Sequence, residues 1–400
     1  MKQEASRKKV ALIFGTRPEA VKMAPVVMAL KSCPQVETRV IVTAQHREML
    51  DQVLDLFGIV PDMDLNIMEP GQTLTRITTK ALEGLETLFA RETPDLVLTQ
   101  GDTTTAFAAS LAAFYRKIAV GHVEAGLRTD NRYDPFPEEM NRRLITTLCD
   151  LNFAPTPLAV ANLKRCGVAQ STIFQTGNTV IDALLHIVEN CDSLMPGEIS
   201  EKLIPGKRYL LVEAHRRENI GRPMESICAA LARLVRDFPD TQLVFPVHKN
   251  PKVRETVFPA LEGKDRITLL EPVDYPVLVS LMKRSHLILT DSGGIQEEAP
   301  SLAKPVLVMR KTTERPEGVD AGTARLVGVE EKDIYDAGAR LLANRQEYDG
   351  MARAVNPYGD GQAARRTVEA ILYHFGFKKD RPEPFLAGSS ASRKAGVASW

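Results

Sequence analysis

The chain has 400 residues, of which 44% are hydrophobic and 26% are charged, and this composition is typical of a globular protein with two or three domains. Its 51 Lys and Arg residues balance 51 Asp and Glu residues, so the zero net charge gives no broad attraction to nucleic acid or to an anionic membrane, and we expect a small-molecule partner. The five cysteines are scattered and never in C-x-x-C spacing, and no stretch reaches membrane-spanning length. These features argue against a disulfide framework, a zinc site and a membrane anchor, and they predict a cytoplasmic protein.

Short β-branched runs alternate with helical patterns along the chain, as is typical of parallel sheets built from β-α-β units. In chain order, strands are predicted at residues 10–14, 38–43, 95–99, 118–123, 151–155, 172–176, 209–213, 242–247, 267–271, 286–290 and 305–309. Residues 177–206 carry no strand pattern, so the domain boundary is placed at their start.

The predicted fold class is α/β, with two doubly wound Rossmann-like domains facing a central cleft. The first domain spans residues 1–176 and is completed by a C-terminal helix at 360–377, and the second spans 177–359. Residues 378–400 have the composition of a disordered tail.

The stretch LILTDSGGIQEE, residues 287–298, passes from an apolar strand through Ser292, Gly293 and Gly294 into a helix. Two glycines let the backbone approach an anion, and the N–H groups of the following helix face it, so the stretch indicates a diphosphate site. Glu298 is placed to accept hydrogen bonds from ribose hydroxyls. The alternative is an ordinary strand-to-helix turn in which Ser292 caps the helix.

Other polar clusters also follow predicted strands, where open parallel sheets bind their ligands. Arg17 and Lys22 follow the first strand, and cations there meet ligand phosphate, although both could be surface charges. Asp102 either caps the helix predicted at 103–115 or acts in the site. Glu124 ends a strand and precedes Ala125 and Gly126, so its carboxylate should point into the cleft.

Glu138 and Glu139 precede Arg142 and Arg143 at i,i+4 spacing, which also fits a solvated helix start with two surface ion pairs. His215 lies among charged residues after a strand and has either a catalytic or a structural role.

The chain lacks G-x-G-x-x-G before the first helix, G-x-x-x-x-G-K-[ST], G-x-S-x-G and H-E-x-x-H. The motifs of nicotinamide-dependent enzymes, P-loop proteins, serine hydrolases and zincins, respectively, are therefore missing. Several carboxylates facing a bound diphosphate suit proton transfer beside a diphosphate leaving group.

A dense set of motifs resembles the bacterial non-hydrolysing UDP-N-acetylglucosamine 2-epimerases over residues 10–375. The motifs are GTRPEAVKMAP, TAQHREMLDQVL, GDTTT, GHVEAGLRT, PFPEEMNR, TGNTVIDALL, HRREN, PVHKNP, TDSGGIQEEAPSL, TTERPEG and NPYGDGQA. The resemblance implies a glycosyltransferase-B-type fold, a homodimer, no metal or redox cofactor, and reversible conversion of UDP-N-acetylglucosamine to UDP-N-acetylmannosamine for cell-surface polysaccharides. The implied reaction eliminates UDP to give 2-acetamidoglucal and adds UDP back.

Carried over residue by residue, the resemblance places acid/base carboxylates at Asp102, Glu124 and Glu138, with His215 near the departing diphosphate. It places UDP-binding residues at Arg17, Lys22, Ser292, Gly293, Gly294, Glu298 and Arg315. Allosteric activation by a second substrate molecule would fall on Gln45, His46 and His248. The chain departs from the family pattern at Gly71, where some members carry arginine, and at Glu213 and Ala214, which replace Thr/Gly-type residues.

Three alternatives stay open from the sequence. A hydrolysing relative would release free N-acetylmannosamine and UDP, a glycosyltransferase of the same fold would pass the sugar to an acceptor, and a nucleotide-sugar sensor would bind without turnover.

Overall fold

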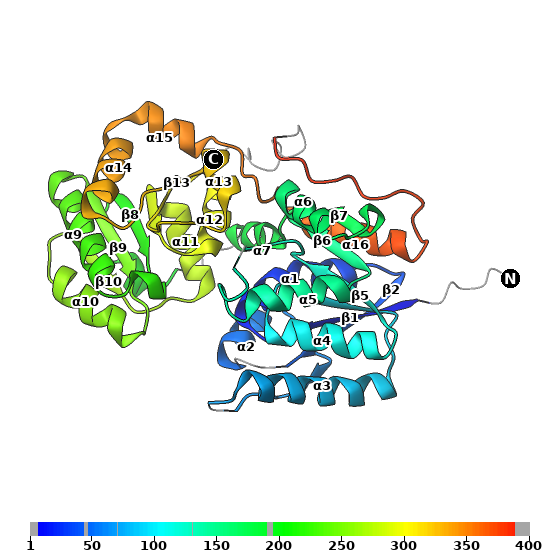
Figure 1. Ribbon diagram of the computed structural model, residues 1–400. Coiled ribbons are helices and arrows are strands. Elements are labelled where there is room, and N and C mark those ends of the chain that lie inside the picture. The colour runs from blue at the N-terminus through cyan, green and yellow to red at the C-terminus, as the bar shows by residue number, and fades with distance from the viewer. Residues whose placement is uncertain (1–6, 44–46, 70, 130, 190–194, 389–400) are drawn as a thin grey trace. The chain divides into compact units, whose positions relative to one another are not determined.

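The computed structural model describes residues 7–388 apart from 44–46, 70, 130 and 190–194. The chain divides into two compact units, each built on one parallel sheet (Figure 1). Unit 1 comprises residues 1–183 and 359–386, and unit 2 comprises residues 184–358 and 387–400.

Unit 1 contains a seven-stranded sheet in the order β3-β2-β1-β4-β5-β6-β7, in which every pair is parallel. Its strands are β1 (Lys8–Phe14), β2 (Val36–Val42), β3 (Met63–Asp64), β4 (Leu96–Gln100), β5 (Ala119–Val123), β6 (Leu151–Ala154) and β7 (Ile173–Gln175). Its helices are α1 (Arg17–Lys31), α2 (Arg47–Leu56), α3 (Leu74–Arg91), α4 (Thr104–Tyr115), α5 (Glu138–Leu148), α6 (Pro157–Arg165), the 3-10 turn η1 (Gln170–Thr172), the start of α7 (Thr179–Val188) and α16 (Ala363–His374).

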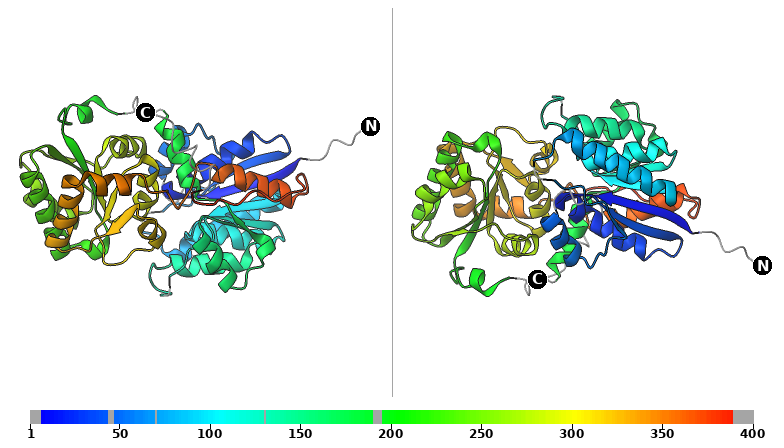
Figure 2. Two further views of the ribbon diagram at one scale, coloured as in Figure 1. Left: turned by 90° about the horizontal axis from the view of Figure 1, so that it is seen from above. Right: turned by 90° about the horizontal axis from the view of Figure 1, so that it is seen from below.

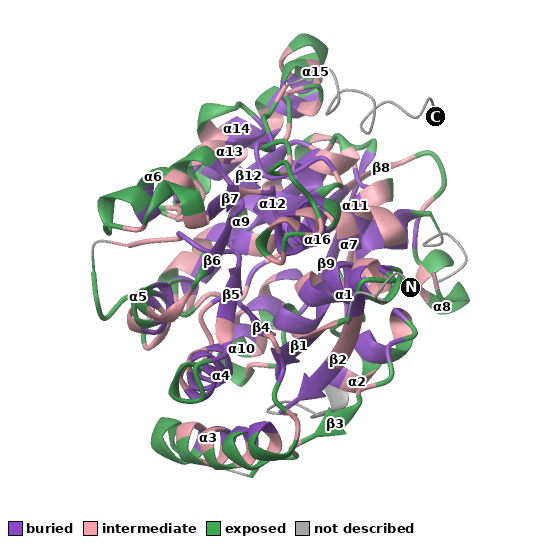
Figure 3. Ribbon diagram, turned by 90° about the vertical axis from the view of Figure 1, so that its right-hand side faces the viewer, coloured by how far each residue is buried: buried purple, intermediate pink, exposed green. Residues whose placement is uncertain are grey.

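Helices cover both faces of this sheet, with α1 and α2 (blue) on one side and α3 and α4 (cyan) on the other (Figure 2). The inner strands β1, β4 and β5 are therefore buried on both faces, and their sequences are mostly apolar rather than alternating. Figure 3 shows this burial along β1, β4 and β5. The returning helix α16 packs against α1.

Unit 2 contains a six-stranded parallel sheet in the order β10-β9-β8-β11-β12-β13. Its strands are β8 (Arg208–Glu213), β9 (Thr241–Pro246), β10 (Ile267–Leu270), β11 (Leu287–Thr290), β12 (Val306–Val308) and β13 (Ala324–Leu326). Its helices are α8 (Gly197–Ser200), η3 (Arg217–Asn219), α9 (Arg222–Asp237), α10 (Pro251–Leu261), α11 (Tyr275–Arg284), α12 (Gly293–Glu298), η4 (Ala299–Leu302), α13 (Pro316–Asp320), α14 (Glu331–Ala343) and α15 (Arg345–Ala352). A large apolar cluster of unit 2 joins β8, β9 and β11 to α9, α10 and α14.

The predicted fold class of two doubly wound α/β domains is confirmed, and each predicted strand is present. The short edge strands β3 and β13 were not predicted. The boundary between the units falls at 183/184, later than the predicted 176/177, because the first turn of α7 belongs to unit 1. Residue 359, where the chain returns to unit 1, packs closely against this first turn of α7, because a Cβ atom added to Gly359 would lie 2.9 Å from Ile181.

Residues 378–386 differ from the predicted disordered tail because they pack on unit 1. The side chain of Phe385 is fully buried, and its N–H donates to the Gln175 carbonyl at 2.8 Å. The Arg381 guanidinium donates to the Ser171 and Ile173 carbonyls at 2.6 Å and lies over the Phe174 ring. Residues 389–400 lie outside the described residues.

Among the described helices, none combines the length and the apolar character needed to cross a bilayer.

Candidate active site

In each sheet the direction of winding reverses between two neighbouring strands, β1 and β4 in unit 1 and β8 and β11 in unit 2. The loops after such strands diverge and leave a crevice at the carboxyl edge of the sheet, where ligands of this fold class bind. Most of the predicted site residues follow these strands or β5.

Glu124 follows β5 and is held by three side-chain donors. Its Oε1 forms an ion pair with Lys22 and accepts a hydrogen bond from Asn178 Nδ2 at 3.0 Å, and its Oε2 accepts from Gln100 Nε2 at 2.5 Å. The backbone of Glu124 is left-handed, with φ of 65°, which for a non-glycine residue costs about 1–3 kcal/mol. The Glu124 carboxylate is therefore held in a fixed position at the cost of a strained backbone.

Asp102 lies in the turn after β4, and its Oδ2 pairs with Arg142 Nη2 at 2.5 Å. Burial raises the pKa of Asp102, and Arg142 opposes that rise. The side chain of Asp102 is 25% exposed, so its carboxylate is accessible to solvent. The expectation that Asp102 caps the next helix is wrong, because Thr103 is the N-cap of α4 and its Oγ1 accepts from the Ala106 N–H at 3.0 Å.

Glu138 begins α5 and is half-buried, and its carboxylate makes no hydrogen bond or ion pair with any described residue. The predicted i,i+4 pair between Glu138 and Arg142 does not form, because Arg142 turns to Asp102 and to Glu139. Glu139 is fully buried instead of solvated, and it pairs with Arg143 at 2.6 Å. Glu138 is thus an available carboxylate at the first turn of a helix.

Glu19 and His122 hold the loops that carry these acids. Glu19 Oε2 accepts from the Thr16 N–H at 2.8 Å and its Oε1 accepts from Thr103 Oγ1 at 2.6 Å, so it joins the loops after β1 and β4. Burial lowers the pKa of His122 to about 4, so its ring is neutral, and Nε2 lies 2.6 Å from the Gly101 carbonyl beside Asp102.

Arg17 and Lys22 differ in what they contact. Arg17 is the first residue of α1, and its guanidinium has no hydrogen-bond or ion-pair partner among the residues that the structure describes. Such a cation suits an incoming phosphate. Lys22 is paired with Glu124, so in this structure it neutralises a carboxylate.

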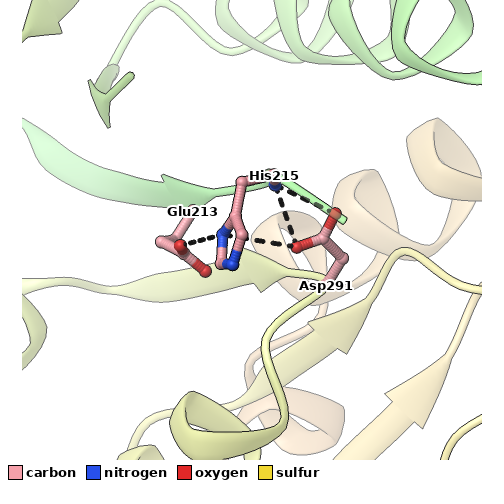
Figure 4. A group of neighbouring side chains, drawn as sticks. All are labelled: Glu213, His215 and Asp291. Carbon is pink, nitrogen blue, oxygen red and sulfur yellow. Dashed lines mark hydrogen bonds and ion pairs between the residues drawn. The ribbon is translucent and has the colours of Figure 1, made fainter. Parts of the chain in front are cut away.

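In unit 2, His215 follows β8 and lies between two acids (Figure 4). Its Nδ1 is 2.5 Å from Glu213 Oε1 and 4.0 Å from Asp291 Oδ1. The close contact with the Glu213 carboxylate raises the pKa of His215, whereas burial opposes the rise. Asp291 also accepts from the backbone N–H groups of His215 and Arg216, at 3.1 and 2.9 Å.

By distance alone, Glu213, His215 and Asp291 are also the one group within the described part of the chain whose ligand atoms could surround a metal ion. Both oxygens of Asp291 already accept hydrogen bonds from the protein, including one from Asn219 Nδ2 at 2.8 Å. We interpret the group as a hydrogen-bonded network that fixes the loop after β8, because its acceptors are occupied.

The glycine turn after β11 faces a cluster of arginines. A Cβ atom added to Gly293 would lie 3.4 Å from Glu314 Oε1, 3.6 Å from Arg216 Nη2 and 4.0 Å from Arg315 Nη2. Burial alone would raise the pKa of Glu314, but Arg315, Arg216 and Arg310 lower it to about 2. A backbone without a side chain, next to several guanidinium groups, fits a bound anion.

Ser292, Gly294 and Glu298 complete this turn. Ser292 is the N-cap residue of α12, but its side chain makes no capping hydrogen bond, so the ordinary-cap alternative is wrong in that detail. Glu298 is 7% exposed, and its Oε2 accepts from the Tyr275 hydroxyl at 2.5 Å. Its Oε1 would lie 3.6 Å from a Cβ atom added to Gly294.

Comparison with known proteins gives the family. Residues 28–372 match the family model described as UDP-N-acetylglucosamine 2-epimerase. The Escherichia coli K12 UDP-N-acetylglucosamine 2-epimerase is 56% identical over 369 residues, which cover 91% of this chain and 98% of that protein. The chain belongs to the UDP-N-acetylglucosamine 2-epimerase family.

Solved structures agree with this family assignment. The Neisseria meningitidis UDP-GlcNAc 2-epimerase bound to UDP-GlcNAc is 48% identical, with a TM-score of 0.84 over 91% of this chain and 99% of that one. The structure of the kitacinnamycin glycosyltransferase shares only 11% identity but reaches a TM-score of 0.60 over 91% of this chain and 98% of that chain. This likeness concerns the fold alone. The two-domain α/β fold is thus of the glycosyltransferase-B type.

Of the three predicted allosteric residues, the structure describes only His248. Gln45 and His46 lie outside the described residues. His248 follows β9 and is exposed, and its ring stacks on His215 with centroids 5.1 Å apart. The structure therefore places His248 beside a predicted catalytic residue.

Arg315 pairs with Glu297, whose side chain is 2% exposed. Five direct partners of a predicted residue or of its loop are absent from the sequence prediction: Glu297, Gln100, Asn178, Glu19 and Asp291. Asp291 adjoins Ser292 and could have been selected by position.

Proposed function

We propose that this protein is a non-hydrolysing UDP-N-acetylglucosamine 2-epimerase that interconverts UDP-N-acetylglucosamine and UDP-N-acetylmannosamine. Family membership supports the substrate class. The observation that carries the proposal is the Glu124 carboxylate, which a strained backbone and three side-chain donors hold beside Asp102 in unit 1. Neither residue is needed as a structural cap, so their placement is explained by proton transfer.

The proposed reaction has two halves. A carboxylate of unit 1 takes the C2 proton as the C1–O bond breaks, and the bonding electrons leave with UDP to give 2-acetamidoglucal. UDP then adds back to C1 while C2 receives a proton on the opposite face. Asp102, Glu124 and Glu138 are the proposed acid/base groups.

Positive charge develops at the sugar ring and negative charge on the diphosphate, so the two ends of the substrate need different environments. Carboxylates of unit 1 would stabilise the ring, and Arg17 would bind the diphosphate. In unit 2, Arg315, the turn Ser292–Gly294 and His215 would receive the departing UDP, and Glu298 would hold the ribose. Losing one well-placed donor would cost about 3 kcal/mol of transition-state stabilisation.

Incubation with UDP-N-acetylglucosamine in deuterium oxide, followed by proton NMR, tests the proposal. We expect deuterium at C2 and a mixture of two sugars that both remain attached to UDP. Free N-acetylmannosamine with UDP would identify a hydrolysing enzyme. Bound nucleotide sugar with no exchange at C2 would contradict epimerisation and would leave a transferase or a sensor.

We further propose that the enzyme is a cytoplasmic homodimer that supplies cell-surface polysaccharide synthesis and uses UDP-N-acetylglucosamine as both substrate and activator. Light scattering of the purified protein should give twice the chain mass of 44.2 kDa. Activation would appear as a rate that rises more steeply than the substrate concentration and that loses this steepness in a His248→Ala variant.

A further inference from the structure

Glu213, at the carboxyl end of β8, is fixed in place by two contacts. Its Oε1 lies 2.5 Å from Nδ1 of His215, and its Oε2 accepts a hydrogen bond from the Thr290 hydroxyl at 3.2 Å. Thr290 is the residue opposite Glu213 in the pairing of β8 with β11. The sheet register itself therefore sets where this carboxylate lies.

Other charged groups face the His215 ring from the neighbouring elements. Asp291 after β11 is 4.0 Å from Nδ1, but its oxygens accept backbone N–H groups. Arg216 lies next in the chain, and its charge opposes protonation of the ring. His248 after β9 stacks on the ring, and Arg254 of α10 disfavours a charge on His248. Glu213 is thus the acid that contacts the ring directly.

We propose that Glu213 is a positioning residue that holds a proton on Nδ1 of His215, so that the ring presents Nε2 and a positive charge to the departing diphosphate. A carboxylate on one ring nitrogen fixes the tautomer and the orientation of the other. The inference rests on the proposed function, because the departing UDP gives the charged ring its role.

The direction of the pH effect follows from these contacts. The contact with the Glu213 carboxylate raises the pKa of His215 against the effect of burial, and the charge of Asp291 acts in the same direction. Glu213→Gln keeps the shape of the side chain and removes its charge, so the pKa of His215 should fall. The charged ring, and with it the turnover that needs it, should then be lost at a lower pH than in the wild type.

Two measurements test the proposal independently. The first is an NMR titration of the His215 imidazole nitrogens, assigned by the resonance that disappears in His215→Gln. The second is kcat against pH with UDP-N-acetylglucosamine. For Glu213→Gln we expect a lower pKa of His215, nearly unchanged kcat at pH 6, and a loss of about tenfold or more at pH 8.5, since a positioned acid or base contributes about 10²–10⁴-fold.

Glu225→Gln is the matched control, because Glu225 is an exposed residue of α9 and the variant loses the same charge. We expect neither measurement to change in it. Should Glu213→Gln fold poorly, Glu213→Thr removes the same carboxylate and should give the same two shifts.

An unchanged pKa of His215 in folded Glu213→Gln, or an unchanged pH profile in an active enzyme, overturns the proposal. If the wild type does not turn over the substrate, the proposed function fails, but the NMR titration still decides whether Glu213 holds the proton.

Discussion

Replacing Glu124 by glutamine removes the charge of the proposed acid/base group while keeping its size. In the wild type, this carboxylate pairs with Lys22 and accepts from Gln100 and Asn178. Breaking a buried ion pair from one side costs about 3–5 kcal/mol. The cost here should be lower, about 1–3 kcal/mol, because glutamine keeps one acceptor and the Lys22 side chain is 16% exposed and can turn toward water.

The effect on turnover should be larger than the effect on stability. A positioned acid or base contributes about 10²–10⁴-fold to the rate, which corresponds to about 2.7–5.4 kcal/mol in the barrier at 1.36 kcal/mol per decade. We therefore expect Glu124→Gln to be folded and to lose at least about a hundredfold in kcat. Initial rates by proton NMR, with urea unfolding of the same preparation, give both numbers.

Glu86→Gln is the matched control, because Glu86 is an exposed residue of α3 and its carboxylate makes no hydrogen bond or ion pair with a described residue. It should keep wild-type turnover and stability. A folded Glu124→Gln variant with kcat within tenfold of the wild type would refute the assignment of Glu124 to proton transfer.

Three further predictions test other parts of the structure. Arg315→Met leaves the buried carboxylate of Glu297 without its ion pair, so we expect a loss of about 3–5 kcal/mol in urea unfolding and weaker UDP binding in calorimetry; UDP affinity equal to that of the wild type would remove Arg315 from the nucleotide site. Gly126→Ala puts a Cβ atom 2.4 Å from a backbone oxygen at φ of 97°, and it should lower the free energy of unfolding by about 3 kcal/mol. Gly167→Ala, at φ of 81° in open space, should lower it by about 1 kcal/mol. Equal losses would show that the close contact at Gly126 relaxes freely. Burial raises the pKa of Asp182 to about 7, so the folded state keeps a proton that the unfolded state releases near pH 4, and the stability from this group is present below pH 4 and lost as the pH rises to 7. The unfolding free energy of the wild type relative to Asp182→Asn should therefore fall by roughly 2–4 kcal/mol between pH 4 and 8, and a flat difference would contradict the raised pKa.

The fold could be predicted because buried parallel strands leave a clear pattern. The runs at Val10–Phe14 and Leu96–Gln100 are covered on both faces and are therefore apolar nearly throughout. The edge strand β3 has only two residues, Met63 and Asp64, both exposed, so no hydrophobic pattern marks it. The packing of Phe385 on unit 1 was missed because one aromatic residue in a polar tail does not change the composition of the tail.

From the residues themselves, charged members of the candidate site could be predicted only where they lie within two residues of the end of a strand. Glu124, Asp102 and His215 meet that condition. Gln100 and Asn178 contact the same carboxylate from places 78 residues apart in the chain, and neutral amides have no pattern that would join them. On α5 the sequence could not tell which glutamate faces inward, because neighbouring helical positions differ by about 100° around the axis.

The kinds of donor that contact each buried acid separate acids that support loops of the fold from acids that we propose take part in proton transfer. Asp291 in unit 2 accepts backbone N–H groups from the loop on the other side of the reversal point of its sheet. Glu19 in unit 1 accepts backbone N–H groups of its own loop and also the Thr103 hydroxyl of the loop after β4. Protonating or moving either acid would release that loop, so neither can easily exchange protons during turnover. Glu124 and Asp102 are held mainly by side-chain donors, which can rotate when a proton or a ligand arrives. That difference in partners, more than burial or charge, is the physical reason to assign proton transfer to Glu124 and Asp102 and loop support to Glu19 and Asp291.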